Sequence, residues 1–168
     1  MKNELEQKNN LVAIGTLAIF YFVFLGGEYL FDNMIAHYLS SAKVVVAQSG
    51  ILGISGIGFL CYFQIQRFIT SKNRSGALMG AVALGIVCIF MVQQHVSFAG
   101  TLSAGLILFF LLGILGGAVH LMAAELWVES RKLARYVGTA YGAGILMQFI
   151  NNNLVRQELV EAVILSVL

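Results

Sequence analysis

The chain has 168 residues, of which 59% are hydrophobic and 11% are charged, and its formal net charge is +2. Soluble globular domains carry about 25% charged residues, so this composition excludes a soluble domain and indicates an integral membrane protein. The small net charge gives no reason to expect a nucleic-acid partner, whereas the lipid bilayer is an expected one. A membrane-crossing helix needs about 20 apolar residues, so we expect an all-α bundle of five or six spans forming one transmembrane domain, residues 1–168.

The first predicted span covers residues 11–36 and follows a short polar segment, MKNELEQKNN. Its apolar part is too long for a cleaved signal peptide, so we expect it to be retained. Near its far end, Glu28 and Asp32 are four residues apart and therefore share one face of the helix. At about 1.5 Å per residue, Glu28 lies roughly 26 Å from Leu11, within a bilayer core about 30 Å thick.

An ionised carboxylate inside a bilayer is unfavourable unless it faces a cavity or a partner, which makes Glu28 a candidate functional residue. We expect Glu28 to bind a proton or a cationic group of a solute. Asp32 either shares a proton with Glu28 or marks the outer boundary of the span, where a polar loop begins.

The second and third predicted spans cover residues 44–66 and 76–95. The third begins with a GxxxG pair, Gly76 and Gly80, and such small residues let helices approach closely in lipid, where no hydrophobic force draws them together. Cys61 and Cys88 lie inside the apolar runs, where cysteine behaves as a small hydrophobic residue, so we expect neither a disulfide nor a metal site.

The fourth predicted span, residues 101–127, carries a second glycine pair, Gly113 and Gly117. His120 lies well inside it and could relay a proton, although a contact with a neighbouring helix explains such a histidine equally well. Glu125 lies at its inner end. It could pair with the basic residues Arg67, Arg74 or Arg131 and form a gate, or these charges could simply be solvated at the interface.

The fifth predicted span, residues 136–155, has the glycine pair Gly138 and Gly142. Gln148 is its deepest polar residue and could hydrogen-bond a solute. The last apolar stretch, residues 162–168, is too short to cross a bilayer. We favour an incomplete sixth span there, and the alternative is an amphipathic helix that lies on the membrane surface.

The basic residues predict the orientation of these spans. Eight of the ten Lys and Arg residues lie on the side of the N-terminus, and only Lys43 and Arg156 lie on the other side. Cytoplasmic loops carry such an excess, so we expect a multi-pass protein of the plasma membrane whose N-terminus is cytoplasmic.

The order of these features resembles the N-terminal six-helix half of a major facilitator superfamily transporter. The segment GISGIGFLCYFQIQRFITSKNRSGALMG has a glycine-rich helix and a short basic loop where that family has its G-x-L-x-D-R-x-G-R-R motif, with Gln66 in place of the aspartate. Gly138 and Gly142 match the glycines of the fifth-span G-x-x-x-G-P motif, but Ala143 replaces its proline. The resemblance implies a second half, on a longer chain, on another chain or in a homodimer.

We therefore expect one half of a secondary transporter that moves a small solute, with protons as possible partners, by alternating access. Two alternatives remain open: a membrane sensor whose bundle binds a ligand, and a substrate-capture subunit of a multi-protein importer. No Ser/His/Asp, Cys/His or metal-ligand spacing rises above chance, so we expect neither an enzyme nor a cofactor.

Overall fold

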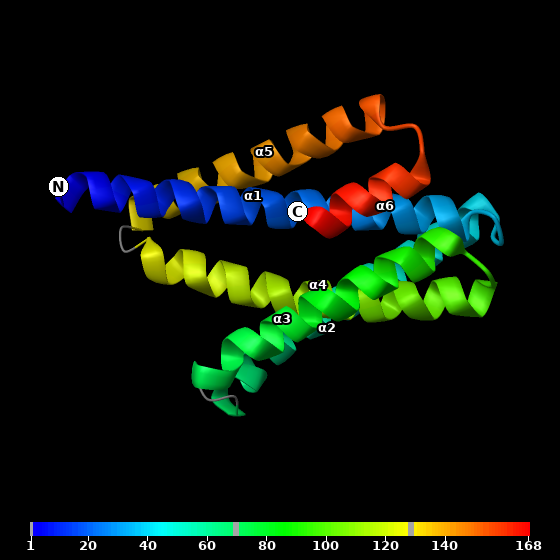
Figure 1. Ribbon diagram of the computed structural model, residues 1–168, viewed down its shortest axis with the longest axis horizontal. Coiled ribbons are helices and arrows are strands. Elements are labelled where there is room, and N and C mark those ends of the chain that lie inside the picture. Colours follow the sequence, from blue (N-terminus) through cyan, green and yellow to red (C-terminus); the bar gives the residue numbers. More distant parts are fainter. Residues whose placement is uncertain (1, 69–70, 128–129) are drawn as a thin grey trace.

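The chain folds as a bundle of helices in the computed structural model, which describes residues 2–68, 71–127 and 130–168. Six helices lie within these ranges, in the order α1 (Lys2–Ile35), α2 (Ser41–Phe68), α3 (Ser71–Gln94), α4 (Phe98–Leu126), α5 (Ser130–Leu154) and α6 (Glu158–Val167). The connections between them alternate between the two ends of the bundle (Figure 1). The prediction of an all-α helix bundle is confirmed.

Four helices of the described chain are long and apolar enough to cross a membrane, over Asn9–Ile35, Ser41–Phe68, Asn73–Gln94 and Phe98–Leu126. They correspond to the first four predicted spans. α5 contains the fifth predicted span, residues 136–155, except for its last residue. It is more polar and is not among these four, so its crossing of a membrane stays a prediction. The residues of the predicted sixth span, 162–168, belong mostly to α6, which has ten residues and packs against α1 and α3.

Several helices are longer than the apolar runs that predicted them. α1 begins at Lys2 instead of residue 11, because Glu, Lys and Gln are good helix formers and extend the helix beyond its apolar part. α4 begins at Phe98 because the side chain of Ser97 caps it, accepting a hydrogen bond of 3.1 Å from the backbone N–H of Gly100. The predicted spans thus locate the helices but not their polar ends.

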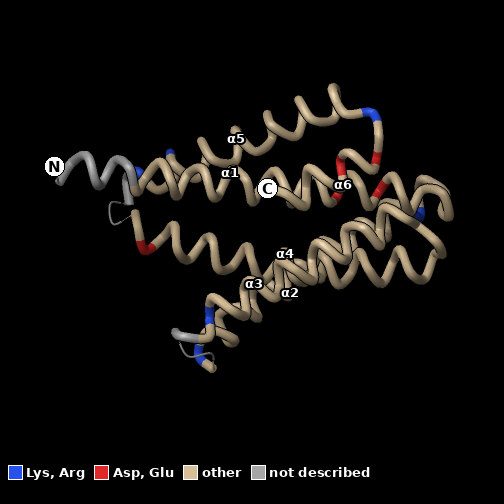
Figure 2. The backbone as a smooth tube through the Cα atoms, viewed as in Figure 1, with Lys and Arg blue, Asp and Glu red and all other residues tan. Residues whose placement is uncertain are grey.

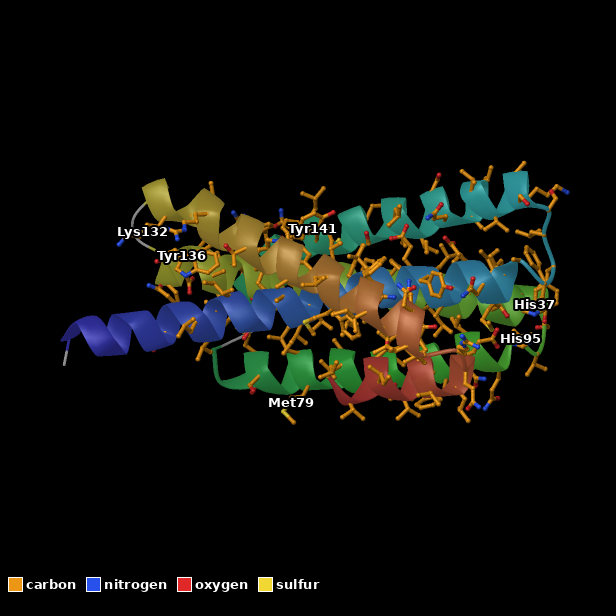
Figure 3. The ribbon with its side chains drawn as sticks, turned by 90° about the horizontal axis from the view of Figure 1, so that it is seen from above. His37, Met79, His95, Lys132, Tyr136 and Tyr141 are labelled. Atoms are coloured by element: carbon orange, nitrogen blue, oxygen red, sulfur yellow. The ribbon has the colours of Figure 1, made fainter. Side chains whose placement is uncertain are left out.

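The most buried helix is α4, which packs against α1, α2 and α3. Half of its apolar window is buried, compared with a third or less in the other three long apolar helices. α2 lies on the opposite side of α1 from α3 and α6 (Figure 3). α5 packs along α1, so α1 and α4 together form the centre on which the other elements are assembled.

Two glycines let the backbones of α2 and α4 approach closely. A Cβ atom on Gly58 would collide with the carbonyl oxygen of Phe110, and one on Gly113 would collide with that of Ser55. One turn further along α4, a Cβ on Gly117 would lie 2.8 Å from Cβ of Tyr62. Gly113 and Gly117 therefore lie where α4 meets α2.

The other two predicted glycine pairs lie in different surroundings. Gly76 and Gly80 on α3, and Gly138 and Gly142 on α5, have no neighbouring atom within 4 Å of the position that a Cβ would take. Within the described chain, no neighbouring helix therefore packs closely against these four glycines.

Charged residues are concentrated at the helix ends. Most of the lysines and arginines lie at the end of the bundle that also holds the N-terminus (Figure 2). The long middle parts of the helices carry almost no charge, which makes the acidic residues within them conspicuous.

Candidate functional site

Two adjoining cavities lie along α1 and meet at Glu28. The first, of about 430 Å³, is lined by aromatic side chains from three helices, including Phe20, Tyr21, Phe59 and Tyr141, and we call it the aromatic cavity. The second, of about 400 Å³, is lined by Asp32, Gln48, Gln148 and Asn152, and we call it the polar cavity. The two cavities share Leu25, Glu28 and Tyr141, so the Glu28 carboxylate lies at the boundary between an aromatic and a polar surface.

The Glu28 side chain is held by a residue of the neighbouring helix. The amide Nε2 of Gln48, on α2, donates a hydrogen bond of 2.7 Å to Oε1 of Glu28. Glu28 is half-buried, and this bond fixes the direction of its carboxylate within the cavity.

The two glycines before Glu28 explain how α1 can carry this acid among packed helices. A Cβ on Gly26 would lie 2.5 Å from Cδ2 of Leu165 on α6 and 2.9 Å from Oε1 of Gln148 on α5. A Cβ on Gly27 would lie 3.7 Å from Leu112 on α4. Glycine at 26 therefore allows both α5 and α6 to contact α1 directly below the acid.

Asp32 lines the polar cavity one turn beyond Glu28. Its Oδ1 atom is buried and has no hydrogen-bond partner among the described residues. A buried carboxylate oxygen without a partner is unfavourable, so this atom would gain from a donor or a cation in the cavity. The structure thus brings Glu28 and Asp32 to the same cavity, as their spacing predicts.

His120 lies behind the aromatic cavity and contacts it through Tyr21. Its Nδ1 is 2.7 Å from the carbonyl oxygen of Gly116, and its Nε2 is 2.9 Å from the hydroxyl of Tyr21. Because a carbonyl oxygen can only accept, Nδ1 donates to Gly116, and Nε2 lies within hydrogen-bonding distance of the Tyr21 hydroxyl. The rings of Phe20 and Phe59 pack on the imidazole at 5.8 and 5.6 Å. These contacts satisfy the histidine, and a relay role for it stays a prediction.

Gln148 lines the polar cavity, and its side chain is buried between the helices. It is 6% exposed, and its Nε2 donates a hydrogen bond of 2.6 Å to Oδ1 of Asn152. Its Oε1 is buried and has no partner in the described chain. Gln148 therefore presents a free acceptor beside Gly26 and Leu165.

The proposed gating residues lie at the other end of the bundle. Arg74 donates to the hydroxyl of Tyr62 and lies over its ring, at 5.5 Å from the ring centroid. These two residues line a separate cavity of about 280 Å³ between α2, α3 and α4. Arg67 and Glu125 are exposed. The side chain of Arg131 lies outside the described residues, so a gate built from these charges stays a prediction.

A pair of histidines lies at the far end, away from both cavities. His37 and His95 stack with their ring centroids 4.7 Å apart, and Figure 3 shows them where the connections after α1 and α3 meet. His95 takes a left-handed backbone conformation, with φ of 34°. They join the two loops and do not line the cavities.

Several residues of the site cannot be recognised in the sequence as functional. Tyr21 and Tyr141 are two aromatic residues among many in apolar runs, and their T-shaped contact at 5.0 Å appears only in the fold. Figure 3 shows Tyr141 on α5. Gln48 was detectable in principle, because an amide is unusual within the apolar run VVVAQSG.

The combination of groups determines what the cavities can bind. Aromatic faces next to a carboxylate attract a cation with an apolar body, because both the ring quadrupole and the negative charge favour positive charge. Within the described ranges, no three His, Cys, Asp or Glu side chains gather closely enough to hold a metal ion.

Comparison of this chain with models of protein families, with curated proteins and with solved structures found no match.

Proposed function

We propose that the protein is the helical half of a secondary transporter of the plasma membrane, and that it binds a small organic cation at Glu28. The observation that carries this proposal is the position of the Glu28 carboxylate, at the junction of an aromatic and a polar cavity. The loop and glycine patterns that resemble major facilitator transporters support the same function.

The geometry suggests how a solute would be divided between the two cavities. An apolar or aromatic group of the solute would pack against Phe20, Tyr21 and Tyr141. Its cationic centre would lie next to Glu28, and polar substituents would reach Gln148 and Asn152. Such a solute satisfies the buried Oδ1 of Asp32 electrostatically, since that atom has no partner within the described protein.

The proposed orientation follows from the basic residues. With the N-terminus in the cytoplasm, the polar cavity lies toward the outer side of the membrane and the aromatic cavity lies deeper. A cation would then enter past Asp32 and reach Glu28 before the aromatic cavity.

A binding measurement tests this proposal with tetraphenylphosphonium, a permanent organic cation with four aromatic rings. We expect the protein in lipid nanodiscs to bind it, and the Glu28→Gln variant to bind it roughly thirtyfold more weakly. This corresponds to about 2 kcal/mol, the lower end of the range for a charge removed from a buried pair. Calorimetry or equilibrium dialysis provides the dissociation constants.

The matched control is Glu125→Gln, which removes an exposed acid at the other end of the bundle. It should leave the dissociation constant unchanged. Equal affinities of the wild-type protein and the Glu28→Gln variant would refute the proposed site. Binding without uptake or efflux by the complete transporter would instead favour the sensor or the substrate-capture subunit.

A further inference from the structure

A buried acid on α6 lies outside the site described so far. Glu161 is 5% exposed, and its Oε1 has no hydrogen-bond partner in the described chain. α6 packs against α1 and α3, so this carboxyl group is enclosed by helices instead of facing solvent. An ionised carboxylate in such a place loses its hydration, and without a paired cation the protonated form is favoured.

The neighbour of Glu161 offers an acceptor for that proton. The side-chain amide of Gln148, on α5, donates a hydrogen bond to the Glu161 carboxyl group. The other N–H of the same amide donates to Asn152, whereas Oε1 of Gln148 is buried and has no partner among the described residues. Two acceptor oxygens cannot bond to each other, but a single proton on Glu161 would supply the missing donor and satisfy both of them.

Among the described residues, no lysine or arginine lies on α6 or on the halves of α1 and α3 that follow residues 18 and 82. On α6 the other charge is Glu158, and on α1 the nearby charges are Glu28 and Asp32, all of them acidic. Cys88 is the titratable side chain in the second half of α3, and His95 follows that helix. The second half of α5 has none, and Tyr141 lies just before it. Arg156 lies in the connection before α6 and is exposed.

The titration of Glu161 agrees with this enclosure. Burial raises its pKa to about 7, opposed by the hydrogen bond from Gln148 and reinforced by the negative charge of Glu158. Glu161 lies outside the four long apolar helices.

We infer that Glu161 is a proton-binding site, which donates its proton to Oε1 of Gln148 while α6 lies against α1 and α3. When the carboxyl O–H bond breaks and the proton passes to water, the negative charge remains among acidic and apolar neighbours. Gln148 then loses its donor. Because Gln148 also lines the polar cavity, the presence of this proton is linked to the shape of the solute site. This inference rests on the proposed transport function and adds to it a proton bound at Glu161. The proton site itself can be tested without any solute.

The expected pH dependence follows from the raised pKa. The folded protein holds this proton between the ordinary pKa of a glutamate, 4.5, and the folded value of about 7, whereas an unfolded chain does not. The contribution of Glu161 to stability is therefore complete at low pH, falls as the pH rises through this window, and is lost above about 7.

Infrared spectroscopy of the protein in nanodiscs tests the site, because a protonated carboxyl group has a C=O stretching band that a carboxylate lacks. We expect a carboxylic-acid band that disappears as the pH rises from about 6 to about 8. While any contribution of Glu28 and Asp32 remains, the Glu161→Gln variant should lose the part of this band that belongs to one carboxyl group. Glu158→Gln, which removes an exposed acid from the same helical turn, should keep it. A band of unchanged amplitude in Glu161→Gln, or one that disappears below pH 5 in the wild-type protein, would overturn the inference.

A second variant distinguishes the hydrogen bond from the proton itself, and it serves equally if Glu161→Gln does not fold. Gln148→Met keeps the length of the side chain and removes the acceptor oxygen. The acid band should then move to higher frequency, because the carboxyl group loses its hydrogen bond. An unchanged frequency would contradict the assignment of Gln148 as the partner. If tetraphenylphosphonium binding fails but the band behaves as described, the proton site stands and the solute proposal falls.

Discussion

Replacing Gly113 with alanine is expected to destabilise the bundle by about 3 kcal/mol, the upper part of the range for overpacking. The added Cβ would collide with the carbonyl oxygen of Ser55 and would lie 2.9 Å from the backbone nitrogen of Phe59. These are backbone atoms of α2, so no side-chain rotation can relieve the collision, and α2 must move away from α4. A thermal unfolding curve of the purified protein in detergent measures the effect.

The same substitution at Gly142 is the matched control, with an expected effect of opposite sign. No atom lies within 4 Å of a Cβ placed there. Alanine favours a helix over glycine by about 1 kcal/mol, so Gly142→Ala should stabilise α5 slightly or leave the protein unchanged. If the two variants unfold at the same temperature, the close contact of α2 with α4 at Gly113 does not exist in the protein.

Replacing Phe31 with alanine is expected to cost about 3 to 5 kcal/mol, as for other fully buried aromatic residues. The Phe31 side chain is 0% exposed, and its ring lies against Gly105 of α4. It belongs to the C-terminal part of α1, which also carries Glu28 and Asp32. Loss of this contact should therefore weaken the packing of α1 around the aromatic and polar cavities. We expect both the affinity for tetraphenylphosphonium and the melting temperature to fall.

Phe149→Ala controls for the loss of an aromatic ring as such. This side chain lines the polar cavity but is 64% exposed, so its removal leaves the core intact. We expect a change in stability below about 0.5 kcal/mol. A similar melting temperature for Phe31→Ala and Phe149→Ala would show that α1 and α4 do not pack as described.

The helices of this fold could be predicted from the sequence, because a long apolar run in a membrane can form few structures other than a helix. Inside lipid each backbone polar group must be satisfied within its own segment, so such runs form helices. Their polar ends were less predictable. At the N-terminus, for example, the apolar run begins only at residue 11, whereas the residues before it still favour a helix, and α1 begins at Lys2.

The packing of the glycine pairs was not predictable, because the pattern is the same in each. Gly113 and Gly117 lie against α2, whereas Gly138 and Gly142 face open space. The GxxxG spacing shows that two glycines share a helix face, but the direction of that face depends on the whole bundle.

Among the candidate site residues, Glu28 was identifiable because a single charge in an apolar run needs an explanation. Its partner Gln48 is twenty positions away and on another helix, so only the fold connects them. Glu161 was overlooked for a different reason. In the amphipathic pattern of α6 it counts as a polar-face residue, yet the helix turns it inward and buries it.

The most direct test of the proposed function is a crystal structure of the protein with tetraphenylarsonium, whose arsenic atom can be located by anomalous scattering. We expect one arsenic peak beside the Glu28 carboxylate, within about 6 Å of the ring centroid of Tyr21 or Tyr141. A peak only at the cavity of Tyr62 and Arg74, or only on the outer surface of the helices, would contradict it.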